Sequence, residues 1–253
     1  MHPAFQHIDH RPWNLPKGAW TWRQSWLDLL FAHWPVPKDA LRPLVPDALD
    51  VQTFDGTSWI GIVPFRMAGV MRRPLPDLPW ISAFPELNVR LYVERDGRPG
   101  VFFLSLDATN PLAVWAARQF FHLPYYRAAI DLVERPGDGA FPAYDYSSHR
   151  RDRRGAPAAF EGSYGPTSEV YLAAPGTLEH WLTERYCLYA VDPKGRMTRT
   201  EVHHVPWPLQ QAEADIRVNT MAAPHGLTLE GPPPLLHFAR GIDVVVWSPA
   251  LLP

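Results

Sequence analysis

The chain has 253 residues and a net charge of −2, so it lacks the basic excess that nucleic-acid-binding proteins carry, and we expect no such partner. Apolar residues make up 46% of it, and 11 Trp, 12 Phe and 9 Tyr supply a packed core, which excludes a disordered chain. A lone cysteine, Cys187, excludes an internal disulfide and a thiolate-rich zinc site and favours a reducing compartment, the cytoplasm.

The sequence shows no targeting or membrane signal. Residues 1–16 contain no apolar stretch of the kind found in signal peptides, and nowhere do about 18 apolar residues run together. We therefore expect neither export nor a membrane span. No internal repeat or long linker divides the chain, so we predict one domain over 1–253.

In the first half of the chain, turn signals separate β-type runs. The 29 prolines fall singly between apolar runs, where they are typical of strand ends and turns. The aromatic segment 20–34 predicts a strand, and segment 51–67 predicts two strands joined by an Asp-Gly hairpin turn. The runs 87–94 and 101–106 predict a second hairpin.

Two helices interrupt the strands. The first begins at Asn110-Pro111, an N-cap residue followed by proline at the first helical position, and ends before Pro124. The second is predicted over 178–186, behind the cap candidate Thr177. Further strands are expected within 140–170 and at 201–210, 235–239 and 244–247. Many short strands with few helices predict a mainly β (α+β) fold, a curved, mostly antiparallel sheet closed into a barrel.

One strand carries three candidate site residues. The segment FPELNVRLYV places Glu86, Asn88 and Arg90 on one face, because side chains alternate with period two. Tyr92 and Glu94 share that parity, so one interpretation is an ordinary solvent-facing side. In a closed barrel the same face lines the interior, where Glu86 can move protons and the other two can bind a substrate.

The next candidates surround the first helix. Asp107 ends a strand just before it, where a carboxylate either caps the turn or holds a substrate donor. Within AARQFFHLPYYRA, Arg118 is a candidate anion ligand, and His122 is either a general base or a helix-end residue. Tyr125 and Tyr126 follow, and each can donate a hydrogen bond to a carbonyl oxygen or simply pack as an aromatic ring.

Eight segments that span nearly the whole chain carry a family resemblance: FAHWPVP, ALRPLVP, FDGTSWIGIVPFRM, FPELNVRLYV, GVFFLSLDATN, AARQFFHLPYY, WLTERYCLYA and HHVPWPLQ. On these segments the chain resembles the YqjF-like family of uncharacterised bacterial proteins, whose fold is similar to that of acetoacetate decarboxylase. The resemblance implies a cone-like antiparallel barrel with a few peripheral helices and an enclosed pocket. It implies no known reaction.

The same resemblance argues against the chemistry of the decarboxylase, which uses a Schiff-base lysine. By this resemblance Arg118 takes the place of a family arginine, and Tyr125 and Tyr126 take the places of two lysines. A phenol cannot form an imine, so we do not expect a Schiff-base decarboxylase. The three lysines of the chain each follow a proline in turn-like contexts that predict solvent exposure: Lys17, Lys38 and Lys194.

Arginines outnumber lysines 21 to 3, which favours anion recognition over amine catalysis. Arg185 lies in an apolar run and, if buried, is either ion-paired with a residue such as Glu86 or a clamp for a substrate carboxylate. His203 and His204 face opposite sides of a predicted strand, so we expect no metal site. No Gly-rich phosphate loop indicates a nucleotide, so no cofactor is predicted, and the basic run 149–155 indicates an exposed loop.

Three classes of function remain open. The chain is an enzyme that acts on a small carbonyl or carboxylate compound by acid–base chemistry, a binding protein for an apolar small molecule, or a structural domain with a filled interior. The interior distinguishes them, because an enzyme needs convergent polar groups with perturbed pKa values and a binder needs a mostly apolar cavity. The oligomeric state does not follow from these residues.

Overall fold

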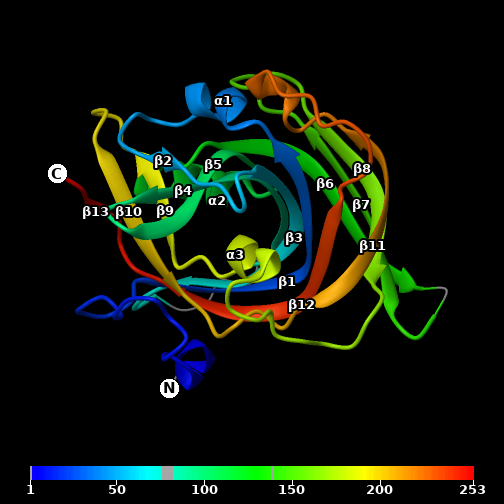
Figure 1. Cartoon of the computed structure of the whole chain (residues 1–253), viewed down its shortest axis with the longest axis horizontal. Helices are drawn as coiled ribbons and strands as arrows, with labels where there is room; N and C mark the ends of the chain where they lie inside the picture. The colour runs from blue at the N-terminus through cyan, green and yellow to red at the C-terminus, as the bar shows by residue number, and fades with distance from the viewer. Residues whose placement is uncertain (1, 76–81, 138) are drawn as a thin grey trace.

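The computed structural model describes residues 2–75, 82–137 and 139–253 and consists mainly of β-strands (Figure 1). The strands are β1 (Trp22–Val36), β2 (Asp50–Val51), β3 (Ser58–Arg72), β4 (Phe84–Arg95), β5 (Arg98–Ala108), β6 (Tyr125–Pro136), β7 (Pro142–Arg150), β8 (Ala159–Pro166), β9 (Cys187–Val191), β10 (Met197–His203), β11 (Gln210–Asn219), β12 (Leu235–Val246) and β13 (Ala250–Leu251). The helices are α1 (Lys38–Leu41), α2 (Pro111–Phe121) and α3 (Leu178–Thr183), with 3₁₀ turns η1 (Pro3–Gln6), η2 (Arg42–Leu44) and η3 (Ala223–His225). The mainly β class predicted from the sequence is confirmed.

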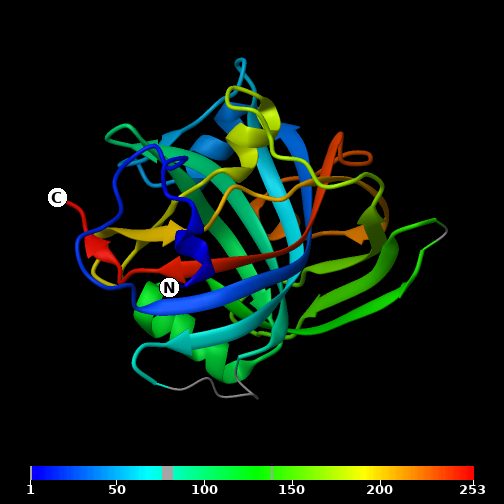
Figure 2. The same ribbon diagram turned by 90° about the horizontal axis from the view of Figure 1, so that it is seen from below.

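All 13 strands of the described residues belong to one sheet, and their pairings close on themselves twice. One ring passes through β1, β3, β4, β5, β9, β10 and β12. The other passes through β5, β6, β7, β8, β11 and β12 and returns through β1, β3 and β4. Most pairings are antiparallel, as predicted, but β5 pairs in parallel with β6 and β9. Figures 1 and 2 together place α2 and α3 at opposite ends of the first ring.

The shared strand β4 has a buried side chain on both of its faces. Leu87, Val89 and Leu91 belong to one hydrophobic cluster, whereas Glu86 and Arg90 point to the other face and are themselves buried. A strand shared by two rings has an interior on each side, so neither face meets water. The solvent-facing interpretation of this strand is therefore wrong.

An irregularity in β1 decides which of its side chains face the first ring. Asp28 has a positive φ of 54°, and the pairing of β1 with β3 shifts register around it. A bulge of this kind reverses the alternation of side chains. As a result the even-numbered Trp22 and Trp26 share a face with the odd-numbered Leu29.

Several predicted elements differ in detail from the structure. The hairpin expected within 51–67 is wrong, because β2 pairs with β4 and only an isolated bridge joins Phe54 to Thr57. The second helix ends at Thr183 instead of 186. The cap of α2 is confirmed, since the Asn110 side chain accepts hydrogen bonds from the backbone N–H groups of Leu112 and Ala113. None of the helices in the described part of the chain has the length and apolar character that crossing a bilayer requires.

The seam between β5 and β9 needs a glycine at position 100. A Cβ there would lie 2.7 Å from the carbonyl oxygen of Cys187 and 2.8 Å from the ring of Tyr189. Because the backbone of β9 cannot retreat without breaking the ring, we expect Gly100→Ala to lower the free energy of unfolding by about 2 kcal/mol. Urea denaturation measures this effect. Gly139→Ala, where an added Cβ meets open space, is the matched control, and equal stability of the two variants would contradict the account.

Candidate functional site

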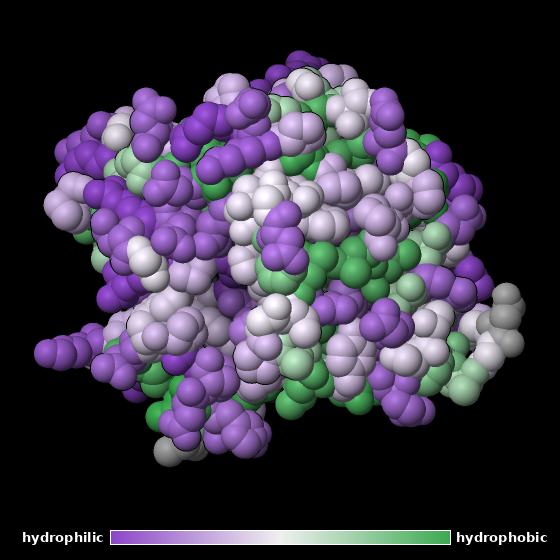
Figure 3. Space-filling model, viewed as in Figure 1, coloured by the Kyte–Doolittle hydropathy of each residue, from purple (hydrophilic) through white to green (hydrophobic). Residues whose placement is uncertain are grey.

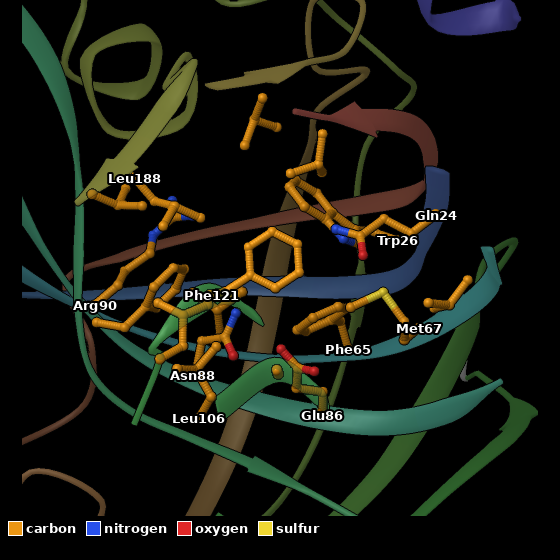
Figure 4. A pocket seen from close by; sticks show the side chains of 18 of the residues that line it. Gln24, Trp26, Phe65, Met67, Glu86, Asn88, Arg90, Leu106, Phe121 and Leu188 are labelled. Carbon is orange, nitrogen blue, oxygen red and sulfur yellow. The ribbon is translucent and has the colours of Figure 1, made fainter. Parts of the chain in front are cut away.

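A cavity of about 250 Å³ lies within the first ring, and all seven strands of that ring contribute to its lining. Helix α2 and the residues at the end of α3 contribute to its lining, and they lie at opposite ends of the first ring (Figure 2). Most of the lining is apolar, with aromatic rings from residues such as Trp26, Phe65 and Phe121 (Figure 4). Trp207 lines the cavity as well. The outer surface seen from the direction of Figure 1 is mixed, with hydrophobic residues gathered near its middle (Figure 3).

Among the described residues that line this cavity, Glu86 is the one with a carboxyl group. It is 1% exposed, and the Tyr125 hydroxyl lies 3.0 and 2.9 Å from its two carboxyl oxygens, to which it donates. Burial raises the pKa of Glu86 to about 8, and hydrogen bonds from Tyr125 and Asn88 oppose this rise. Within the described ranges Glu86 has no ion-pair partner. A buried carboxyl without a cation therefore faces an apolar cavity.

Tyr125 lines the same cavity and is 8% exposed. It begins β6, whose parallel pairing with β5 sets Tyr125 opposite Leu106. Burial, together with the adjacent Glu86, raises the pKa of Tyr125 well above its usual value, so the phenol stays neutral. The carboxyl of Glu86, which titrates near neutrality, can therefore pass a proton to or from a bound molecule, while the neutral phenol beside it donates a hydrogen bond.

Arg90 and Arg185 are the arginines among the described lining residues, and both are more than nine-tenths buried. Of the two alternatives for Arg185, the ion pair with Glu86 is not formed. Arg185 is instead held by the side-chain oxygen of Gln52 and by the carbonyl oxygen of Trp181. The cavity therefore brings together five of the predicted site residues: Tyr125, Glu86, Asn88, Arg90 and Arg185.

Arg118 and His122 lie outside the lining of this cavity. Arg118 donates from Nη1 to the carbonyl oxygen of Tyr125 at 2.9 Å, so it supports the backbone of a lining residue. His122 is the C-cap of α2 in the left-handed conformation, with φ of 56°. It borders a second cavity of about 290 Å³.

Asp107 and Tyr126 also lie outside the cavity, in a cluster around Arg150. Asp107 is fully buried and accepts hydrogen bonds from Arg150 Nη2 at 2.6 Å and Nε at 2.9 Å. The Tyr126 ring lies 4.2 Å from the Arg150 guanidinium carbon, a cation–π contact. The run 149–155 was predicted to be an exposed loop, and for Arg150 this prediction is wrong. Arg150 is the last residue of β7 and forms a buried ion pair with Asp107.

The sequence analysis did not identify Tyr92 as a site residue. Tyr92 does not line the cavity itself, but it holds the side chain of the lining residue Arg90. Its hydroxyl accepts a hydrogen bond from Arg90 Nε at 3.1 Å and lies 2.5 Å from His33 Nε2. Burial and Arg90 hold the pKa of His33 well below its usual range, so we assign the tyrosine as the donor to a neutral imidazole. The signal is present in the sequence, because Tyr92 shares the strand parity of Glu86, but the same parity is equally compatible with a solvent-facing side.

The three lysines are exposed, as predicted: Lys17, Lys38 and Lys194. None of them lines the cavity. Across residues 2–75, 82–137 and 139–253, no three His, Cys, Asp or Glu side chains come together in a way that could hold a metal ion.

Comparison with known proteins places this geometry in a family. Residues 23–243 match the family model DUF2071, described as an uncharacterized conserved protein. The uncharacterized protein YqjF of Bacillus subtilis (strain 168) is 46% identical over 234 residues, which cover 92% of this chain and 93% of that protein.

Solved structures of similar fold have much lower sequence identity. The enduracididine biosynthesis enzyme MppR complexed with pyruvate matches with a TM-score of 0.62 at 14% identity, covering 97% of this chain and 93% of that one. Acetoacetate decarboxylase from Legionella pneumophila matches with a TM-score of 0.63 at 10% identity, covering 99% and 94%. The predicted resemblance is confirmed: the chain belongs to the DUF2071 family of YqjF and has an acetoacetate decarboxylase-like fold.

Proposed function

We propose that the cavity binds a small molecule with a carbonyl or carboxyl group, that Glu86 exchanges a proton with it, and that Tyr125 assists as a neutral hydrogen-bond donor. The observation that carries this proposal is the buried Glu86 carboxyl, which has a phenol donor and no cation and faces an apolar cavity. A group whose pKa lies near neutrality is populated in both protonation states at working pH, as a general acid–base catalyst requires.

The chemistry would run without an imine, because the lysines of this chain are exposed and do not line the cavity. The Glu86 carboxylate takes a proton from the carbon next to a carbonyl, and the electron pair moves onto the carbonyl oxygen. The same carboxyl returns the proton when the enolate collapses. Tyr125, which keeps its own proton, orients the Glu86 carboxylate through its hydroxyl. Once Glu86 carries the substrate proton and no longer needs that hydrogen bond, the same hydroxyl donates to the negatively charged enolate oxygen.

The solved relatives support the ligand class. MppR, with the same fold, was solved complexed with pyruvate, a small molecule with both a carbonyl and a carboxylate. At 14% identity the comparison with MppR shows only that the two folds are similar. That this cavity takes the same class of ligand is part of our proposal. We also propose that the two rings act as one barrel-like domain around the cavity and that the protein is cytoplasmic, consistent with the free, buried Cys187.

Deuterium exchange at carbon tests the proposal. Purified protein in D₂O is incubated with methyl ketones and with oxo acids whose keto group lies either next to the carboxylate or several carbons away from it. Loss of the protons on the carbon beside the keto group is followed by NMR. We expect exchange above the buffer rate, reduced about 100-fold by Glu86→Gln because general acid–base catalysis contributes about that much. Glu213→Gln, an exposed glutamate, is the matched control. Exchange absent across the panel, or unchanged in Glu86→Gln, would overturn the proposal.

A second candidate is a binding protein without catalysis, and the largely apolar and aromatic lining favours it. In that case the polar groups only orient the ligand. Mass spectrometry of small molecules retained by the purified protein, combined with an absence of exchange, would decide for the binder.

A further inference from the structure

We infer that Arg90 and Arg185 together form an anion site at the α3 end of the cavity, and that its ligand is a monocarboxylate with an extended apolar body. This inference rests on the proposed function, since it names the ligand class of the same cavity. It goes further in committing to where the carboxylate lies and to how long the molecule must be.

Arg185 is built into the wall with one nitrogen left over. Its Nε donates to the carbonyl oxygen of Trp181 at 2.6 Å, and its Nη1 donates to Gln52 Oε1 at 2.5 Å. Its Nη2 is buried and has no hydrogen-bond partner. The guanidinium also stacks on the rings of Trp181, at 4.4 Å, and Tyr92, at 5.1 Å. The fork is thus fixed in place, with one donor unused.

Arg90 shows the same arrangement. Its Nε donates to the Tyr92 hydroxyl at 3.1 Å, and its Nη2 donates to the carbonyl oxygen of Leu182 at 3.0 Å. Its Nη1 has no hydrogen-bond partner among the described residues. Its guanidinium carbon lies 4.9 Å from the ring centre of Phe31 and 5.4 Å from that of Tyr92. Tyr92 therefore contacts both arginines and ties them to the same part of the wall.

Two buried guanidinium groups of like charge require an anion. Burying a cation without a counter-charge is costly, and neither arginine forms an ion pair within the described ranges. The carboxylate of Glu94 is reached only through Gln52, whose Nε2 donates to it at 2.7 Å. Burial lowers the pKa of Arg185 to about 10, so it remains charged at neutral pH. An anion that enters the cavity would supply the missing partner for both groups.

The geometry of β4 indicates the length of the ligand. Glu86 and Arg90 lie four residues apart on one face, about 13 Å along the strand, with Asn88 between them (Figure 4). A molecule whose carboxylate meets the arginines and whose reacting carbon meets Glu86 must therefore be longer than pyruvate. The apolar lining between these groups favours a hydrocarbon body of about six to eight carbons.

Calorimetric titration of the wild-type protein tests this inference. Straight-chain monocarboxylates from acetate to decanoate are compared with their primary amides, which have the same shape without the charge. We expect the acids to bind at least about 10-fold more tightly than the amides, with an optimum near hexanoate to octanoate. Equal affinity for acid and amide, a preference for acetate, or no binding of either series would overturn the inference.

Variants locate the anion. Arg185→Met is expected to weaken octanoate binding at least about 10-fold and to remove most of the preference for octanoate over octanamide, whereas Arg153→Met, at an exposed arginine, should change neither the affinities nor the preference. If Arg185→Met does not fold, the wild-type comparison and Arg185→Lys, which keeps the charge and loses the fork, decide the matter. Acid-selective binding without carbon exchange would overturn the proposed proton transfer alone, and Glu86-dependent exchange without acid selectivity would overturn the anion site alone.

Discussion

Replacing Asp107 by asparagine is expected to lower the free energy of unfolding by about 3–5 kcal/mol, because Arg150 would remain buried without its counter-charge. The side chains of Asp107 and Arg150 are 0% and 1% exposed, and two guanidinium nitrogens engage the carboxylate. Burial raises the pKa of Asp107 and Arg150 opposes that rise, so desolvation offsets much of the attraction between the two. Urea denaturation at pH 7 measures the loss.

Two further variants separate the buried charge from the packing. Asp107→Leu combined with Arg150→Met should recover most of the stability, because replacing both members of a buried pair by apolar groups is often close to neutral. Asp145→Asn, which breaks the half-exposed Asp145–Arg135 pair, should cost below about 1 kcal/mol. A loss in Asp107→Asn no larger than in Asp145→Asn would contradict the account.

The local features of this fold followed from the sequence, whereas its closure did not. The cap at Asn110 and the period-two pattern of β4 depend on neighbouring residues, and both were predicted correctly. The hairpin expected within 51–67 failed because Val51 pairs with Val93, a partner 42 residues away. Pairings between residues so far apart in the sequence depend on the arrangement of the whole sheet. The Asp-Gly pair at 55–56 indicates only the local turn, which here is bounded by the isolated bridge between Phe54 and Thr57.

The same difference between local patterns and long-range pairing explains which parts of the site could be predicted. Alternation placed Glu86, Asn88 and Arg90 on one face, but the sequence could not decide between solvent and interior, because that depends on strands β9, β10 and β12 closing the ring. Tyr125 and Arg185 reach the same cavity from segments far away along the chain. Arg118 looked like an anion ligand because it interrupts an apolar helix, yet its donor is directed to a backbone carbonyl.

Glu86 should make the stability of the protein fall as the pH rises from about 4.5 to about 8. Its pKa is about 8 in the folded protein against 4.5 in a model peptide, so between these values the folded state binds more protons than the unfolded chain. The free energy of unfolding therefore falls through this window, by about 3 kcal/mol at pH 7. Glu86→Gln carries no titrating proton and should lose this dependence.

The difference in stability between Glu86→Gln and the wild-type protein isolates this effect. Buried histidines such as His203, whose pKa burial lowers to about 4, impose the opposite slope in acid, but they are present in both proteins and cancel. Urea denaturation from pH 5 to 7 should show the difference growing by about 1.4 kcal/mol per pH unit in favour of the variant. Glu213→Gln, at an exposed site, should run parallel to the wild-type protein. A difference that does not change with pH would mean that Glu86 is ionised in the folded protein at neutral pH, and the acid–base role proposed for it would fall with that result.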